Sequence, residues 1–146
     1  MSEVTVVRVK LLRAGAILPR RATAQASGFD LYACLGTEDV ALSQKPTLVP
    51  TGIALEVPEG LDAQIRPRSG LARHGVLSTF GTLDADYRGE LMVALYMTAP
   101  DIAYTVRDGD RIGQLVLTRL ATVELVEAET LSTSDRGTGG HGSTGR

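Results

Sequence analysis

Two short segments of the sequence combine charged and hydroxyl side chains with glycine in ways that suit phosphate or metal chemistry. Residues 27–33 carry Asp30, a carboxylate near a glycine that could hold a metal-bound water or an arginine. Taken alone, this segment is better explained by an ordinary turn aspartate. Residues 66–72 place Arg68 and Ser69 beside a rigid proline and Gly70. A guanidinium can bind phosphate oxygens in pairs and a hydroxyl can donate to a bridging oxygen, although a capped turn with surface arginines is an even alternative.

Two further segments add carboxylates and an amide. In residues 81–89, glycines bracket Asp84, Asp86 and Tyr87, which is typical of a hairpin loop with exposed backbone. An aspartate with a water in reach can act as a general base, but a hydrophilic β-hairpin without any chemistry would show the same residue pattern. In residues 108–115 a glycine turn leads into a strand, where strict alternation predicts Arg111 and Gln114 on opposite faces. The alternative there is a salt-bridged strand start with Gln114 as a buried amide.

The last stretch of the chain, residues 132–146, differs from all that precedes it. Eleven of its 15 residues are Gly, Ser or Thr. Such a segment buries too little apolar surface to offset its ordering entropy, so we expect a mobile arm. Its backbone N–H groups, with Arg136 and several hydroxyls, could wrap phosphates. A disordered terminus is the simpler alternative, and a Walker A loop is excluded because no Lys precedes Ser143.

Short apolar runs between turn signals predict the β-strands that must position these segments. The predicted strands are residues 5–12, 53–57, 61–66, 90–97, 102–106, 111–118 and 123–128, with one helical turn near residues 69–73. Strands of this length and spacing favour an all-β sandwich or barrel. We therefore expect one β domain over residues 1–131, followed by the arm over residues 132–146.

The composition narrows the class of protein. A chain of 146 residues fits one domain, and a net charge of −2 argues against a surface built to coat nucleic acid. Cys34 is the only cysteine, so no internal disulfide can form and a reducing compartment is expected. Arg8, Lys10 and Arg13 interrupt the N-terminal apolar run, which argues against a signal peptide or membrane span. The expected location is the cytoplasm.

No segment is strong alone, but their order along the chain resembles the homotrimeric dUTPase family. The five family motifs fall on residues 27–33, 66–72, 81–89, 108–115 and 136–145. The resemblance implies a jelly-roll-like β barrel or sandwich with a flexible glycine-rich C-terminal arm. It also implies a homotrimer with active sites shared between subunits. The implied reaction is Mg²⁺-assisted hydrolysis of dUTP to dUMP and pyrophosphate, which limits uracil in DNA and supplies dUMP.

The resemblance also assigns roles to residues. Asp84 would deprotonate the water that attacks the α-phosphorus, Gln114 would help to place that water, and Asp30 would support the magnesium ion through water. Tyr87 would pack on the deoxyribose and exclude a 2′-hydroxyl. The other substrate-binding residues would be Arg68, Ser69 and Gly70 at the phosphates, Ser78, Gly81, Thr82 and Leu83 at the uracil, and Arg136, Gly140, His141, Gly142, Ser143 and Thr144 in the closing arm.

Two positions depart from the family pattern, and two other functions stay open. Ser78 stands where the family often has Asn, and His141 where its arm usually has Phe. A dCTP deaminase would share the fold but typically uses a glutamate near the third motif, where this chain has Asp84, with Glu90 just beyond. A nucleotide-sensing or protein-binding module is the other alternative. The expected partners are dUTP and further copies of the chain, without nucleic acid or membrane.

Overall fold

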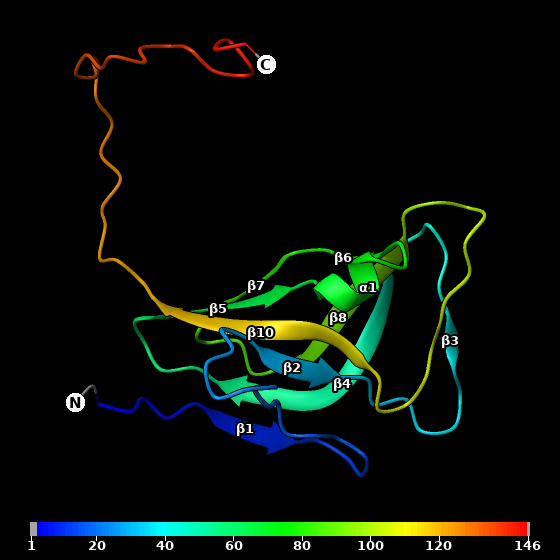
Figure 1. Cartoon of the computed structure of the whole chain (residues 1–146). Coiled ribbons are helices and arrows are strands. Elements are labelled where there is room, and N and C mark those ends of the chain that lie inside the picture. Colours follow the sequence, from blue (N-terminus) through cyan, green and yellow to red (C-terminus); the bar gives the residue numbers. More distant parts are fainter. Residues whose placement is uncertain (1–2, 146) are drawn as a thin grey trace.

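A computed structural model describes residues 3–145 and shows strands arranged in sheets (Figure 1). One four-stranded sheet has the order β1 (Arg8–Leu11), β4 (Thr47–Glu56), β8 (Glu90–Met97), β6 (Val76–Ser78). The other has the order β2 (Phe29–Tyr32), β10 (Arg111–Arg119), β5 (Leu61–Arg66), β7 (Gly81–Leu83). A two-stranded sheet joins β3 (Val40–Ala41) to β9 (Thr105–Val106), and α1 (Ser69–Ala72) is one helical turn. Every strand pairing is antiparallel.

The core lies between the inner faces of the two larger sheets. Along β8, every second residue is buried, and Leu91, Val93 and Leu95 are almost completely so. The other sheet contributes buried residues such as Leu31 and Ile65 to the same cluster. Each fully buried aliphatic side chain stabilises the fold by about 1.5–3 kcal/mol relative to exposure. This architecture confirms the predicted all-β, jelly-roll-like fold.

Most of the predicted elements form, and one does not. The strands at residues 61–66 and 90–97 and the helical turn near residue 69 are confirmed. The predicted strands at residues 5–12 and 102–106 shorten to β1 and β9. Of the strand predicted at residues 53–57, residues 53–56 form the end of the longer β4. The strand predicted at residues 123–128 was wrong. This short apolar run finds no partner strand within residues 3–145, and Leu125 is 97% exposed.

Arg111 and Gln114 lie on the same face of β10, which corrects the expectation from alternation. Arg111 pairs with Tyr32 and Gln114 pairs with Asp30, two residues away on β2. A β-bulge between them inserts one extra residue, so that Ile112 and the adjacent glycine are both buried. The bulge brings the guanidinium and the amide to one side of the sheet.

The segment of residues 81–89 is not the hairpin that its glycines suggested. β7 pairs with β5 in one sheet, whereas β8 pairs with β4 and β6 in the other. The chain therefore crosses from one layer of the sandwich to the other between Leu83 and Glu90. Turn residues mark a change of direction, but they do not say whether the flanking strands pair with each other.

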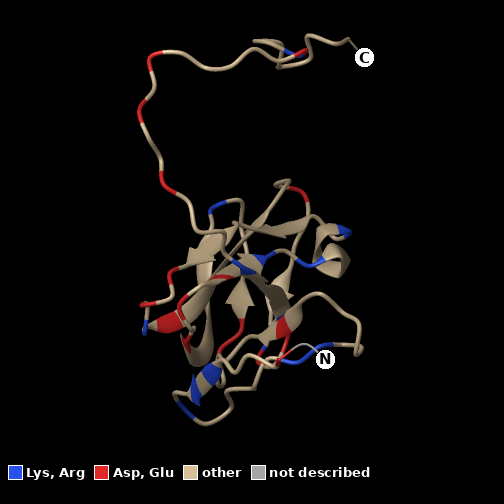
Figure 2. Ribbon diagram, turned by 90° about the vertical axis from the view of Figure 1, so that its left-hand side faces the viewer, with Lys and Arg blue, Asp and Glu red and all other residues tan. Residues whose placement is uncertain are grey.

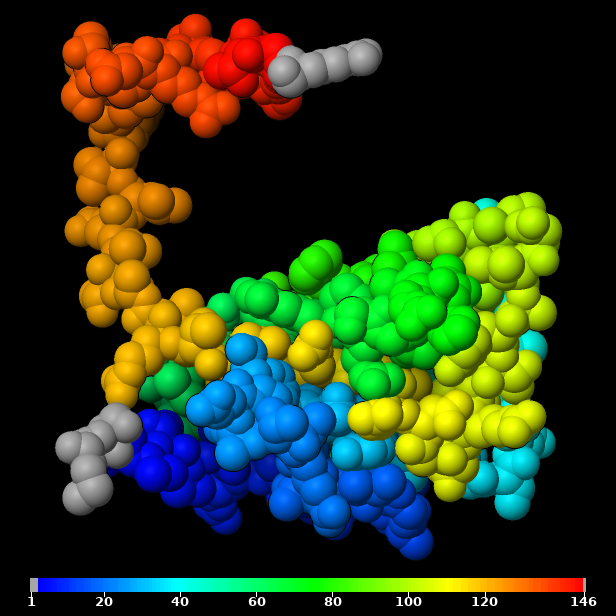
Figure 3. Space-filling view, in the orientation of Figure 1, coloured from blue at the N-terminus to red at the C-terminus, as the bar shows by residue number. Residues whose placement is uncertain are grey.

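After Arg119 the chain leaves the body of the molecule as an extended arm (Figures 1 and 3). Residues 120–145 contain no strand or helix, and local turns are their main internal structure, such as Arg136 Nε donating to the Gly139 carbonyl at 2.9 Å. Acidic residues are spaced along the first part of the arm, while most basic residues lie on the body (Figure 2). Within residues 3–145, no helix is long and apolar enough to cross a membrane.

Candidate active site

A cluster of opposite charges lies where β2 meets β10. The Asp30 carboxylate is 3.6 Å from Arg68 Nε and 3.6 Å from an Arg111 guanidinium nitrogen. Only 15% of the Asp30 side chain is exposed, so solvent screens these attractions less than on an open surface. Both distances exceed a normal hydrogen bond, so each guanidinium keeps donors for another partner. With two cations around one carboxylate, the cluster carries a net positive charge and suits a polyanion.

Gln114 ties this cluster to the segments on either side. Its amide nitrogen donates to the Pro67 carbonyl at 2.9 Å, which fixes the side chain beside the Arg68 segment. A Cβ added to Gly28 would lie 2.3 Å from Gln114 Oε1, so any side chain at this position would force the Gln114 amide to move. The structure thus brings three of the predicted segments together, at residues 27–33, 66–72 and 108–115. We call this group, with Asp30, Arg68, Arg111 and Gln114, the phosphate half-site.

The short helix α1 completes the phosphate half-site. It begins just after Arg68, whose backbone is extended, and its buried anchor is Leu71. No side chain caps its first turn, so its first backbone N–H groups stay available beside the exposed Ser69 and Gly70. Phosphate oxygens are bound by backbone N–H groups and guanidinium groups, and both kinds of donor are present here.

A second group of predicted residues lies around the β7–β8 crossing. Asp84 and Tyr87 line a hollow of about 220 Å³, whose other lining residues are Thr82, Leu83, Glu90, Leu91 and Met92. The Tyr87 hydroxyl donates to the Glu90 carbonyl at 3.0 Å, and the ring stays 46% exposed. The Tyr87 amide donates to the Asp84 carbonyl at 3.0 Å, which closes a tight turn between the two side chains. We call this group the nucleoside half-site.

The two half-sites of one chain lie far apart. In the strand register, Asp30 on β2 lies opposite Gln114 on β10, and Gln114 lies opposite Arg66 on β5. Leu83 on β7 lies opposite Ala63, farther along β5. From β2 to β7 there are three strand spacings of about 4.8 Å each. Along β5, Arg66 and Ala63 are three residues apart, at about 3.3 Å per residue. Together these offsets place the two regions on the order of 15–20 Å apart. A general base must lie within hydrogen-bond reach of its water, so Asp84 cannot serve the phosphate half-site of its own chain.

Two other sets of predicted residues lie outside both half-sites. Ser78 is buried to 4% exposure on β6, does not line the nucleoside hollow, and its hydroxyl has no hydrogen-bond partner within residues 3–145. The arm residues Arg136, Gly140, Gly142, Ser143 and Thr144 lie in the segment that extends away from the body (Figure 3). His141, in the same arm, has a left-handed backbone with φ 52°, which a non-glycine residue rarely adopts.

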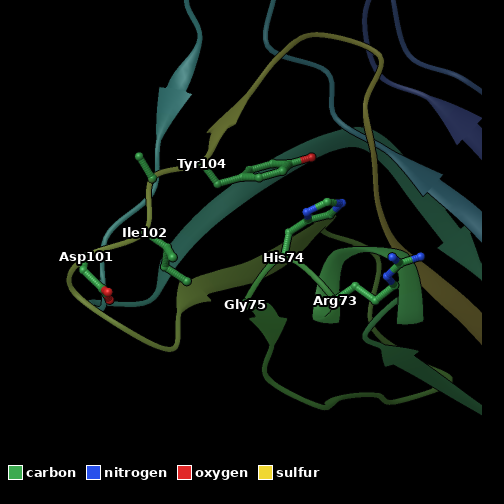
Figure 4. Close-up of a pocket in the computed structure, with 7 residues that line it drawn as sticks. Arg73, His74, Gly75, Asp101, Ile102 and Tyr104 are labelled. Carbon is green, nitrogen blue, oxygen red and sulfur yellow. The ribbon is translucent and has the colours of Figure 1, made fainter.

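A larger hollow of about 680 Å³ contains none of the predicted residues (Figure 4). It lies between the end of α1, with Arg73 and His74, and the loop before β9, with Asp101, Ile102 and Tyr104. Its lining mixes one acidic side chain, two basic side chains, a tyrosine and apolar groups, without a converging set of like donors. Size alone therefore does not locate the active site, and the chemistry of the two half-sites does.

Sequence reasoning missed Arg13. Its guanidinium contacts Glu90 Oε1 at 2.7 Å and donates to the Cys34 carbonyl at 3.2 Å. The hydrogen bond to Glu90 raises the pKa of Arg13 above its ordinary value, so this group is charged at every working pH. In the sequence Arg13 only interrupts an apolar run, and nothing local indicates a partner 77 residues away.

Comparison with known proteins decides the family. The sequence profile of the dUTPase family matches residues 14–145. The chain belongs to the dUTPase family. It is 46% identical to the deoxyuridine 5′-triphosphate nucleotidohydrolase of Syntrophotalea carbinolica over 95% of this chain and 96% of that one. It is 45% identical to the protein of the same name from Wolinella succinogenes, over 100% of this chain and 99% of the relative.

Solved dUTPase structures share the fold. The dUTPase of Staphylococcus bacteriophage 80alpha with dUPNHPP superposes with a TM-score of 0.88 at 27% identity, covering 98% of this chain and 100% of that one. A mutant dUTPase from phage phi11 of S. aureus, described for its coordination of a structural Mg(II) ion, superposes with a TM-score of 0.78 at 24% identity. It covers 88% of this chain and 100% of that one, and at this identity the likeness concerns the fold alone. The family expected from the five motifs is therefore confirmed.

Proposed function

We propose that this chain is a dUTP diphosphatase, which hydrolyses dUTP to dUMP and pyrophosphate. Family membership supports the reaction, and so do relatives named for it at about 45% identity over almost their whole length. The observation that carries the proposal is the presence of both half-sites. One has spare cationic donors for a triphosphate, and the other sets a carboxylate beside a tyrosine-lined hollow. A dCTP deaminase is not favoured.

The active unit is proposed to be a homotrimer in which each site combines half-sites from neighbouring subunits. The separation of Asp84 from the Asp30 cluster supports this, because a base and the phosphates it acts on must meet at one substrate. The arm of residues 132–146 would then close over a site formed by other subunits, with its Arg136 at the phosphates and His141 at the base. The domain of residues 1–131 would supply everything else.

In the proposed mechanism, the chain positions the substrate and offsets its charge. Asp84 accepts a proton from the water that attacks the α-phosphorus, and Gln114 orients that water with the oxygen opposite its anchored amide nitrogen. Arg68 and Arg111 neutralise charge on the phosphate oxygens. Thr82 and Leu83 present backbone to the uracil, and Tyr87 fills the space that a 2′-hydroxyl would need.

Mg²⁺ is proposed as the cofactor, held mainly by the substrate. Within residues 3–145 no three acidic, histidine or cysteine side chains converge on one point, so an all-protein metal cage is not offered. Magnesium usually keeps several waters and binds through one or two carboxylates plus phosphates, and Asp30 provides one such carboxylate beside the phosphate half-site. When bound, the ion supplies charge neutralisation on the triphosphate. Asp30 would hold its water shell while Arg68 and Arg111 hold Asp30.

A substrate panel tests the proposed function. Pyrophosphate release is measured with dUTP, UTP, dTTP and dCTP in parallel, with and without Mg²⁺, and ammonia release is measured with dCTP. We expect release from dUTP far above the other three and dependence on Mg²⁺. Ammonia from dCTP would favour the deaminase instead, and binding of dUTP without product would favour a nucleotide sensor. The expected cytoplasmic location is tested separately by fractionation of cells that express the chain.

A further inference from the structure

The start of β8 is anchored by an ion pair from a segment remote in sequence. Glu90 Oε1 accepts from the Arg13 guanidinium at 2.7 Å and from the backbone N–H of Gly52 at 2.8 Å. Arg13 also donates to the Cys34 carbonyl at 3.2 Å, so the guanidinium joins three separate stretches of chain. The side chains of Arg13 and Glu90 are 41% and 27% exposed, which leaves the pair only partly screened by solvent.

The same residue holds Tyr87 through its backbone. The Glu90 carbonyl accepts from the Tyr87 hydroxyl at 3.0 Å, so the ring is oriented by a residue whose own side chain is fixed by Arg13. The ring lies over Gly89, where an added Cβ would be 2.4 Å from the tyrosine oxygen. The absence of a side chain at Gly89 therefore leaves room for the Tyr87 ring, and the hydrogen bond to the Glu90 carbonyl fixes the position of its hydroxyl.

The other hydrogen bonds of the loop between β7 and β8 lie within the loop itself. The Tyr87 amide donates to the Asp84 carbonyl at 3.0 Å, and the Arg88 guanidinium donates to the Ala85 carbonyl at 2.6 Å. The strands that flank the loop belong to different sheets, so no ladder of hydrogen bonds joins its two ends. Beyond Glu90, the next anchor is Thr51 Oγ1 donating to the Leu91 carbonyl at 2.7 Å, which holds β8 but not the loop. The Tyr87 hydroxyl therefore bonds to a residue that is held by its pairing with Ala54 on β4 and, through its carboxylate, by Gly52 and Arg13.

We propose that Arg13 is a positioning residue for sugar discrimination. The Arg13–Glu90 pair holds the Glu90 carbonyl where it orients Tyr87 against the sugar of the bound nucleotide. This inference rests on the proposed function, because it assumes that Tyr87 meets the deoxyribose. Arg13 itself lies outside both half-sites and touches no reacting atom.

The test compares specificity constants for dUTP and UTP in matched variants. Arg13→Met removes the cation and keeps most of the side-chain length, whereas Arg13→Lys keeps the charge. Tyr87→Phe removes only the hydroxyl. We expect Arg13→Met and Tyr87→Phe each to narrow the preference for dUTP roughly fivefold, the size of one net hydrogen bond. The kcat for dUTP should change less than the KM for UTP. Arg13→Lys should retain most of the preference.

The control and the double variant separate positioning from general stability. Arg8→Met breaks another Arg–Glu pair, 3.1 Å between Arg8 and Glu56 on the exposed β1–β4 edge, and should leave the preference unchanged. Arg13→Met combined with Tyr87→Phe should narrow the preference no further than either change alone, because both act on one hydrogen bond.

Two failures are distinguishable. If the wild-type chain does not hydrolyse dUTP in preference to UTP, then either the proposed function or the proposed exclusion of a 2′-hydroxyl by Tyr87 is wrong. The inference about Arg13 is then wrong as well. If wild type shows the preference but Arg13→Met shows it undiminished, the positioning role alone is overturned. The same holds if Arg13→Met lowers Tm without changing the preference. Additive losses of the dUTP preference in the Arg13→Met, Tyr87→Phe double variant would also overturn the positioning role of Arg13.

Discussion

Gly28 leaves room for the Gln114 side chain in the phosphate half-site. Gln114 Oε1 would lie 2.3 Å from a Cβ at this position, and the Gln114 amide is already committed to the Pro67 carbonyl. Gly28→Ala should therefore displace Gln114 from its site on β10. We expect kcat/KM for dUTP to fall roughly 10²-fold, as is usual when a positioning group moves by about an ångström. Steady-state pyrophosphate release measures it, and a melting curve shows that the variant is folded. Wild-type kcat/KM would mean that Gln114 has no part in catalysis.

Asp84 is the proposed general base, so its substitution tests the proposed chemistry most directly. Asp84→Asn keeps the shape of the side chain but cannot accept a proton at neutral pH. We expect dUTP binding to persist while kcat falls roughly 10²–10⁴-fold, the range for loss of a general base. Calorimetric titration and single-turnover kinetics separate the two effects. As a matched control, Asp86→Asn changes the neighbouring carboxylate of the same loop and should retain most of the kcat. Retention of kcat by Asp84→Asn would assign the base elsewhere.

At the scale of elements, the body and the arm make different contributions. The strands of the two sheets bury the core, whereas residues 120–145 contain no strand or helix and are mostly exposed. The β-bulge in β10 is the one irregularity in the body that the site requires, because it brings Arg111 and Gln114 to the same face. Regular pairing would point one of the two away from Asp30.

Deletion of residues 134–146 tests the role of the arm. The segment is too rich in glycine and polar residues to belong to the core, so its loss should change stability by less than about 0.5 kcal/mol. We expect a folded trimer with little dUTP hydrolysis, because the arm would no longer close the site. Melting curves, light scattering and pyrophosphate release measure the three properties. A large drop in Tm or undiminished turnover would each contradict a closing arm.

At the scale of the whole molecule, the layout of the sheet supports the proposed trimer. β5 lies between the two half-sites, and its register separates them by more than a catalytic distance. A symmetric trimer can bring the nucleoside half-site of one copy to the phosphate half-site of the next, three times over. An exposed segment that extends away from the body over residues 121–145 (Figure 1) is consistent with an arm that acts on a neighbour.

Mixed trimers test the sharing of sites directly. Asp84→Asn and Arg68→Ala should each be inactive alone, because every site carries one defect. When the two variants are unfolded and refolded together, roughly a quarter of the sites should receive both intact halves by random assortment. We therefore expect recovery of activity in the mixture, and none when the two trimers are mixed without unfolding. Full inactivity of the co-refolded mixture would place the whole site within one chain.

The sequence by itself determined the family, the all-β class and the identity of the chemical groups. Alternating apolar residues located β5, because a half-buried strand repeats every two residues, and a short apolar run between turn signals located β8. The order of the five motifs indicated the dUTPase family because each motif needs particular residue types for phosphate or base. These are local properties, and they are visible in the chain without a partner.

Only the tertiary structure decided which of these groups meet. The short run of mostly apolar residues at 123–128 resembled a strand, but a strand exists only where another edge accepts its hydrogen bonds. The bulge that turns Gln114 toward Asp30 depends on the register with β2, and the Arg13–Glu90 pair joins residues that only folding brings close. The distance between Asp84 and the phosphate half-site follows from the order of strands in the sheet. Pairing is a relation between distant segments, and local sequence patterns do not contain it.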